Sequence, residues 1–89
     1  ILQGITYEGN VPVVYSIGNF LFNSRDLDSC LLKVTIGSEG LRSLQFLPAK
    51  QKNCMTSLLD GSEKERVLNE IRELSPGVNI YVSGYLNEL

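Results

Sequence analysis

Hydrophobic and polar residues alternate with a period of two near the start of the chain. The alternation is loose over residues 2–7, a turn-forming cluster follows at 8–10, and β-branched and aromatic residues resume over 11–16. Successive side chains of a strand point to opposite faces, and adjacent glycine and asparagine residues favour turns. The pattern therefore predicts a β-hairpin, with Pro12 near the start of its second strand because proline donates no ladder hydrogen bond.

A second alternating region follows a polar stretch, residues 23–29, which we expect to form a loop. Residues 31–36 then alternate again, and Leu32, Val34 and Ile36 fall on one face of the predicted strand. Such alternation is typical of an antiparallel strand that has one face on the core and one in water.

The return of this strand is predicted over residues 41–47. Glycines at both ends of the segment 37–40 indicate a turn with positive φ, so the two strands form a second hairpin. Pro48 is expected to end the returning strand. Residues 49–56 are compatible either with an extended continuation of the sheet past a bulge or with a simple connection.

One amphipathic helix is predicted over residues 62–75. Ser62 and Glu65 have capping-box spacing, in which each side chain bonds the backbone amide of the other residue. The apolar residues that follow recur at helical spacing and define the buried face: Val67, Leu68, Ile71 and Leu74. Ser-Pro-Gly at 75–77 ends the pattern, and the tail 78–89 alternates too weakly to decide between a strand and a helical turn.

These elements predict an α+β fold made of two β-hairpins that form part of a sheet, with one packed C-terminal helix. The 89 residues form a single unit, with sheet strands in 1–48, the helix in 62–75 and a tail in 78–89. A chain of this size buries little over ~60% of its unfolded surface, so the core is expected to be thin. The 43% apolar and 20% charged residues are ordinary for a globular protein.

Composition removes several classes of function. Eight basic residues are scattered along a chain of net charge −2, which predicts no nucleic-acid partner. The longest apolar run is shorter than the roughly 20 residues of a membrane-spanning helix, which predicts no membrane segment. The absence of histidine removes the usual general base and the commonest transition-metal ligand. Cys30 and Cys54 are either two small buried thiols, the interpretation we favour, or one disulfide.

Asp26 and Asp28 are the acidic pair with the best spacing for a hard cation. They would supply two oxygens from one side of a loop, whereas calcium takes six to eight ligands and no EF-hand spacing follows. We therefore favour a solvated loop, and we assign no metal ligand within these residues.

The segment VPVVYSIGNFLFN, residues 11–23, begins as a buried strand and is then interrupted by Ser16, Gly18 and Asn19. In a structural interpretation, Gly18 permits a sharp bend, Asn19 satisfies freed backbone groups and Phe20 fills the core behind the turn. In a functional interpretation, small polar residues at the end of a strand border a binding site. The residues alone favour the structural interpretation.

The segment LQGITYEGNVPVVYSIGNFLFN resembles the CapA-type family of bacterial capsule-synthesis and poly-γ-glutamate synthesis proteins. Members of this family carry a histidine-rich GHHPH-style motif, a strand containing V-L-Q and a second strand that ends in S-L-G-N-F. Leu2 and Gln3 match the first strand and residues 16–20 match the second, with Ile17 in place of leucine. A weaker likeness continues through the strand LLKVTI, the helix and the pair Gly84 and Tyr85.

The resemblance implies a fold and a function. It implies a place in a four-layer α/β/β/α metallophosphoesterase-like sandwich, in a protein that makes or exports an anionic capsule polymer at the bacterial cell envelope or its extracellular face. The histidine motif would precede Ile1, so we expect the chain to be the C-terminal part of a longer protein and to be inactive by itself. A divalent metal and an anionic polymer or phosphoester substrate are expected for the parent, and Ser16, Gly18 and Asn19 are expected to border its site.

A different class of function remains open, in which the chain is a non-catalytic binding or assembly module of a cell-envelope protein. Strands without all their neighbours expose backbone edges and apolar side chains, which pair with other chains. We therefore expect the isolated chain to self-associate.

Overall fold

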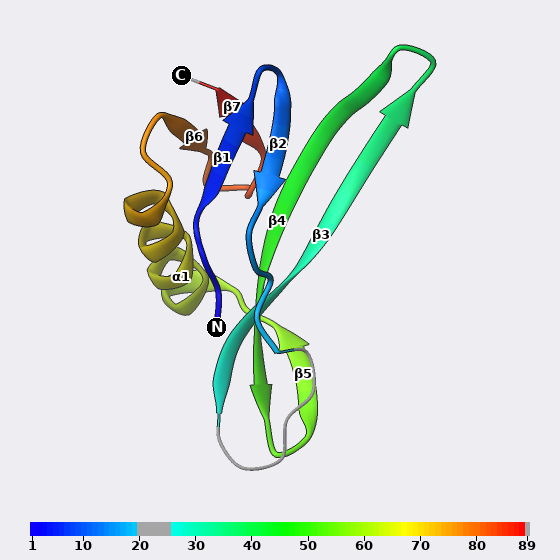
Figure 1. Cartoon of the computed structure of the whole chain (residues 1–89). Coiled ribbons are helices and arrows are strands. Elements are labelled where there is room, and N and C mark those ends of the chain that lie inside the picture. Colours follow the sequence, from blue (N-terminus) through cyan, green and yellow to red (C-terminus); the bar gives the residue numbers. More distant parts are fainter. Residues whose placement is uncertain (20–25, 89) are drawn as a thin grey trace.

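The computed structural model describes residues 1–19 and 26–88 and has the predicted α+β character (Figure 1). Its sheets are small and antiparallel, in the orders β1-β2, β3-β4-β5 and β6-β7. The elements are β1 (Ile5–Glu8), β2 (Val11–Val14), β3 (Leu27–Gly37), β4 (Gly40–Lys52), β5 (Met55–Leu58), α1 (Gly61–Leu74), β6 (Val78–Ile80) and β7 (Leu86–Glu88).

The first predicted hairpin is confirmed. β1 and β2 pair antiparallel from Ile5 opposite Val14 to Glu8 opposite Val11. The turn between them contains Gly9, whose φ of 63° is accessible to glycine without steric cost. Ile5 is fully buried, so this hairpin contributes to the main core.

The second hairpin is also confirmed, but its strands are much longer than predicted. β3 starts at Leu27, so the expectation of a loop through residue 29 is wrong for residues 27–29, while 23–25 lie outside the described residues. Ser29 is 1% exposed and pairs with Ala49. Its hydroxyl donates to the carbonyl of Ile17 at 3.2 Å, which satisfies a polar side chain inside the sheet.

Pro48 does not end β4, which corrects a second expectation. The strand continues to Lys52 and pairs with β5 from Ala49 onward, so the sheet extends past the proline. The carbonyl of Pro48 accepts the amide of Leu59 at 2.9 Å. The backbone nitrogen and carbonyl of one strand residue point to the same side of the strand, so the nitrogen of Pro48 points away from β3, toward the position where β5 has just ended. The lack of an N–H at Pro48 therefore removes no hydrogen bond to β3.

The same edge of β4 is covered further up by the tail. The amide of Phe46 donates to the carbonyl of Gly84 at 2.7 Å, and Gln45 forms an isolated bridge with Tyr85. Gly84 has φ 92°, and a Cβ there would collide with the Phe46 carbonyl. The tail, for which the sequence left strand and helical turn open, is the β6-β7 hairpin.

The helix is confirmed, but its start differs from the prediction. α1 begins at Gly61 after Asp60, so Ser62 lies within the first turn and the capping box with Glu65 is wrong. Glu65 instead pairs with Arg72 at 2.6 Å. The predicted face is confirmed for its first three apolar members, Val67, Leu68 and Ile71, whereas Leu74 is 55% exposed.

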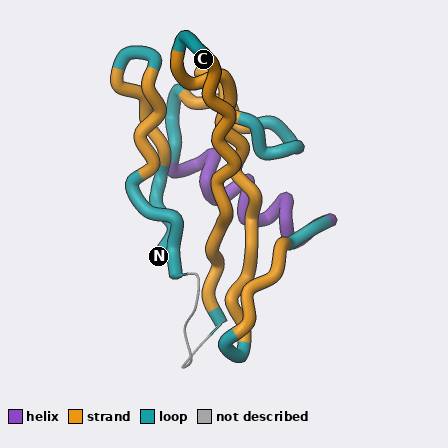
Figure 2. The backbone as a smooth tube through the Cα atoms, turned by 90° about the vertical axis from the view of Figure 1, so that its right-hand side faces the viewer, coloured by secondary structure: helices purple, strands orange, loops and turns teal. Residues whose placement is uncertain are grey.

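The main core lies between α1 and the strands, and Figure 2 shows the helix crossing behind the long sheet. It joins eight buried side chains: Ile5, Cys30, Phe46, Val67, Leu68, Ile71, Val78 and Ile80. The first hairpin is joined to the end of the helix here, because the buried amide of Ile5 donates to Ser75 Oγ at 2.8 Å, across 70 residues of sequence.

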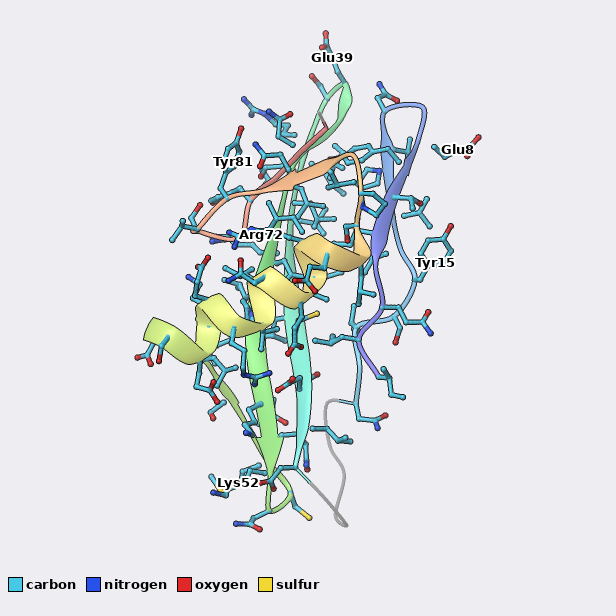
Figure 3. The ribbon with its side chains drawn as sticks, turned by 90° about the vertical axis from the view of Figure 1, so that its left-hand side faces the viewer. Glu8, Tyr15, Glu39, Lys52, Arg72 and Tyr81 are labelled. Atoms are coloured by element: carbon cyan, nitrogen blue, oxygen red, sulfur yellow. The ribbon has the colours of Figure 1, made fainter. Side chains whose placement is uncertain are left out.

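The far half of the β3-β4 hairpin extends away from this core (Figure 1). Leu32 packs partly against the core, whereas Val34 is 48% and Ile36 73% exposed. Ile36 lies opposite Leu41, which is 44% exposed. We call Val34, Ile36 and Leu41 the apolar strip. Figure 3 shows the turn residue Glu39 at one end of the long hairpin and Lys52 at the other.

Candidate functional site

The segment singled out in the sequence joins two parts of the fold. Ile17 forms an antiparallel bridge with Leu2, and Gly18 forms one with Ser29 of β3. The chain that leaves the first hairpin therefore reaches the outer edge of β3 directly.

Gly18 is the residue on which this junction depends. Its φ is 77°, and a Cβ at this position would lie 2.9 Å from the carbonyl oxygen of Asp28 and 3.2 Å from a methyl group of Leu2. Both the backbone conformation and the close packing exclude an ordinary side chain. The predicted bend at Gly18 is thus found, together with a contact to β3 that the sequence did not indicate.

The other predicted residues of the turn differ from one another. The Ser16 hydroxyl donates to the Ile1 carbonyl at 2.6 Å and accepts the Gly18 amide at 3.3 Å, so it stabilises the local backbone. Asn19 is exposed. The expectation that Phe20 fills the core lies outside the described residues. Ser16 and Gly18 are therefore brought together as a structural unit, with Asn19 at its surface.

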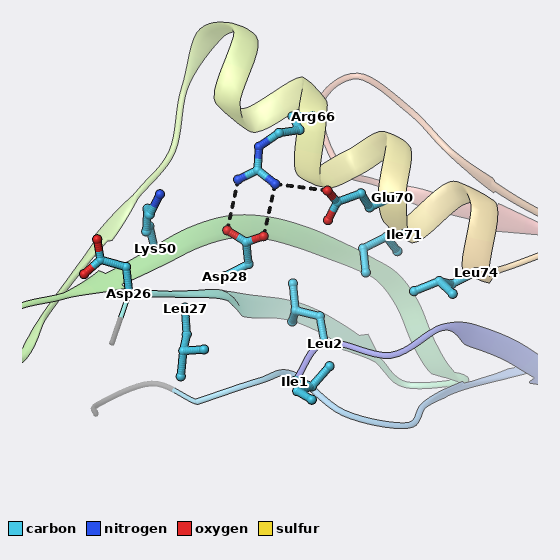
Figure 4. A pocket seen from close by; sticks show the side chains of 10 residues that line it. All are labelled: Ile1, Leu2, Asp26, Leu27, Asp28, Lys50, Arg66, Glu70, Ile71 and Leu74. Atoms are coloured by element: carbon cyan, nitrogen blue, oxygen red, sulfur yellow. Dashed lines mark hydrogen bonds and ion pairs between the residues drawn. The ribbon is translucent and has the colours of Figure 1, made fainter. Parts of the chain in front are cut away.

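A half-open cleft of about 420 Å³ is lined in part by Asp28 and Leu2, the two residues that also lie next to Gly18 (Figure 4). β3 and β4 contribute charged residues and α1 contributes both charged and apolar ones. The ten lining residues are Ile1, Leu2, Asp26, Leu27, Asp28, Lys50, Arg66, Glu70, Ile71 and Leu74.

Arg66 organises the charges of this cleft. Its two terminal nitrogens donate to the two carboxylate oxygens of Asp28 at 3.0 and 3.1 Å, a bidentate pair between helix and strand (Figure 4). Arg66 also donates to Glu63 at 2.9 Å and to Glu70 at 3.0 Å. The hydrogen bonds to Asp28 and then to Glu63 raise the pKa of Arg66 above its ordinary value. The positive charge of this guanidinium is compensated by three carboxylates, so Arg66 would bind a phosphate only weakly.

The expectation that the acidic pair lies in a solvated loop is wrong for Asp28, which lies in β3, whereas Asp26 is exposed just before that strand. Asp28 contacts Arg66, and Asp26 and Lys50 lie at one end of the cleft in Figure 4. Among residues 1–19 and 26–88, no group of His, Cys, Asp and Glu side chains is arranged to hold a metal ion.

Sequence reasoning did not single out Arg66. Its spacing to Glu63 and Glu70, three residues before and four residues after, was visible as a helical charge pattern. Its principal partner Asp28 was not, because that contact spans 38 residues.

A second arginine fastens the helix to the tail. Arg72 Nε donates to the Ile80 carbonyl at 2.8 Å, and a terminal nitrogen donates to Asn69 at 2.7 Å. Figure 3 shows Arg72 between the helix and the tail strands. This contact holds β6 beside the C-terminal turn of α1.

The two cysteines are both free thiols, as predicted, but the expectation that both are buried is confirmed only for Cys30 and is wrong for Cys54. Cys30 is 1% exposed in the main core, where burial raises its pKa to about 12. Cys54 is exposed in the turn between β4 and β5.

Comparisons with known proteins return no relative. No protein-family model matches the chain, and the searches of curated proteins and of solved structures find no significant match. Within the described residues, no helix has the length and apolar character needed to cross a membrane.

Proposed function

We propose that the chain is part of a CapA-type protein that makes or exports capsule polymer or poly-γ-glutamate at the bacterial cell envelope. In this proposal the 89 residues supply strands and one packed helix at the C-terminal side of a four-layer α/β/β/α metallophosphoesterase-like domain. The parent uses a divalent metal on an anionic polymer or a phosphoester, and residues outside this chain ligate that metal.

The observation that carries the proposal is the backbone at Gly18. This glycine belongs to the S-I-G-N-F segment on which the resemblance rests, and its φ of 77° and its contact with Asp28 give the glycine a physical necessity. This segment joins the first hairpin to β3. Such a position is compatible with a turn that borders the metal site of the proposed parent protein.

Within this proposal, Asn19 is the member of the turn that faces an adjacent site. The Ser16 hydroxyl is engaged with the backbone of Ile1 and Gly18, whereas Asn19 is exposed. The neutralised Arg66 is not assigned to the substrate, because its hydrogen bonds go to Asp28, Glu63 and Glu70.

The test is to express the chain together with the residues encoded before Ile1, and to measure bound divalent metal and hydrolysis of bis(p-nitrophenyl) phosphate. We expect metal-dependent turnover that EDTA abolishes. Asn19→Ala should lower kcat/KM with little loss of stability, whereas Asn10→Ala, an exposed asparagine in a distant turn, should leave kcat/KM unchanged. Absence of both metal and turnover contradicts the enzymatic part, and a stability loss that activity merely follows contradicts the role of Asn19.

A second candidate function is a non-catalytic assembly module of a cell-envelope protein. The observation that favours it is the apolar strip, which extends from the core along one face of the long hairpin and includes Ile36 at 73% exposure. Contiguous exposed apolar side chains beside the unpaired edge of a strand are typical of interaction surfaces.

A further inference from the structure

The outer edge of β3 is an unpaired strand edge next to the apolar strip. β3 is the first strand in the order β3-β4-β5, and within the described residues the only pairing on its other side is the bridge of Gly18 to Ser29. On the edge that faces away from β4, the backbone of residues 31–37 therefore pairs with no other strand of the described chain. Figure 1 shows this part of β3 at the outside of the molecule.

This stretch alternates regularly, so its two faces are well defined. Thr35 pairs with Ser43 and Ile36 with Leu41, which places the extra residue of the bulge, Arg42, on β4. β3 itself is uninterrupted, and Val34 and Ile36 lie on the same face. Lys33 is the only charged side chain in residues 31–37.

We propose that a second copy of this chain occupies the edge, through antiparallel pairing of β3 with β3 about a two-fold axis at Val34. In this register Val34 faces its own counterpart, Leu32 faces Ile36, and residues 31 and 37 face each other. Each Lys33 lies opposite Thr35 of the other copy. An isologous contact of this kind closes after two copies.

Charge and apolar patterning select this register. Pairing centred on Lys33 would place two lysines opposite each other on the axis, which is unfavourable. Pairing centred on Thr35 would place Leu32 opposite Ser38 in the turn and would shorten the ladder. The register about Val34 avoids both faults and joins the apolar strips of the two copies on one face of a continuous sheet.

This inference rests on the assembly function and is independent of the CapA-type proposal. The metal and phosphodiester measurements have the same outcome whether or not β3 pairs with itself.

The first experiment tests the register by disulfide formation in the Cys54→Ser background, because Cys54 is exposed. Val34→Cys places the two introduced thiols directly opposite each other, within the roughly 4.4–6.8 Å Cα separation that a disulfide requires. Ile36→Cys is the control, because its two thiols are separated by four strand residues, about 13 Å. Under oxidised glutathione, Val34→Cys should form covalent dimer at least about tenfold faster than Ile36→Cys.

The second experiment tests the pairing of Lys33 with Thr35 by sedimentation equilibrium of the full chain. Thr35→Glu adds two opposite-charge pairs to each dimer and should lower the dimer Kd about three- to tenfold, while Thr35→Lys should raise it by a similar factor. Ser43→Glu and Ser43→Lys are the matched controls, because Ser43 lies opposite Thr35 on β4, away from the edge. They should change the dimer Kd less than about twofold.

Three results overturn the proposal. A wild-type chain that stays monomeric at about 1 mM excludes both the dimer and self-assembly as a function. Any partner of the β3 edge would then be a different protein. Equal disulfide rates at positions 34 and 36 contradict the register while leaving association intact. Equal effects at Thr35 and Ser43, or equal effects of Glu and Lys at position 35, show association that does not use the β3 edge.

Discussion

The two halves of the β3-β4 hairpin have the same antiparallel pairing and opposite environments. In the half that contains Cys30 and Phe46, both side chains are at most 1% exposed, whereas in the half that contains Val34 and Ile36 both are about half exposed or more. The difference comes from α1, β1 and β6, whose buried side chains form one cluster with Cys30 and Phe46, whereas Val34 and Ile36 lie outside that cluster. Alternation decides which side chains share a face, and a distant element decides whether that face is buried.

The largest expected effect comes from truncating one apolar side chain in each half. Phe46→Ala should lower the free energy of unfolding by about 3–5 kcal/mol, because it removes a fully buried aromatic ring. Ile36→Ala should change it by about 0.5 kcal/mol or less, because that side chain is 73% exposed. Urea denaturation followed by circular dichroism at low protein concentration measures both.

A small and equal loss in the two variants would contradict the division of the hairpin into a covered and an uncovered half. Where Phe46→Ala is unfolded without urea, Phe46→Leu, which removes less volume, replaces it in the comparison with Ile36→Ala.

The next effect separates a crowded glycine from an open one. Gly18→Ala should cost about 2–4 kcal/mol, because the left-handed backbone is strained and the new Cβ meets the Asp28 carbonyl. Gly9→Ala has a similar positive φ but no atom within 4 Å of its Cβ, so it should cost about 1–2 kcal/mol. Thermal unfolding of the two variants measures the difference. Equal losses of stability would show that Gly18 is required only for its backbone conformation and not for its close packing against Asp28.

The smallest expected effect is a pH dependence that originates in the covered half. Burial raises the pKa of Cys30 from 9.0 to about 12, so the folded state favours the neutral thiol. The stabilisation is complete below pH 9 and is lost as the pH rises toward 12, by at most about 1.4 kcal/mol per pH unit.

Unfolding free energies measured between pH 7 and 10.5 should fall less steeply for Cys30→Ala than for wild type. Cys54→Ser, which removes the exposed thiol, should keep the wild-type slope. Identical slopes in all three proteins would exclude Cys30 as the origin of the pH dependence.

Local signals predicted the elements whose causes are local. The turn at Gly9, the hairpin turn before Leu41 and the buried face at Val67 and Ile71 follow from neighbouring residues, and the structure has them. The helix start was wrong because Asp60, two residues before Ser62, immediately precedes the helix.

The wrong expectations concern residues whose partners lie far along the chain. Ser29 is in a strand because Ile17 and Ala49 satisfy it, and Pro48 is tolerated because its missing donor faces the end of β5. In the cleft, Asp28 acquires its role from Arg66, 38 residues away. The bend at Gly18 was predictable from its residue type, but its contact with Asp28 depends on the full register of β3.

The hydrogen bond from the Ile5 amide to Ser75 Oγ sets an order of events during synthesis. The first strand emerges from the ribosome long before the residue that accepts its buried amide, which is 70 positions later. The first hairpin can therefore pair with itself early but cannot dock until the helix has been made and has emerged. Nascent chains that stop before residue 75 should therefore leave this hairpin accessible to proteases and chaperones, because the acceptor of its buried amide has not yet been made.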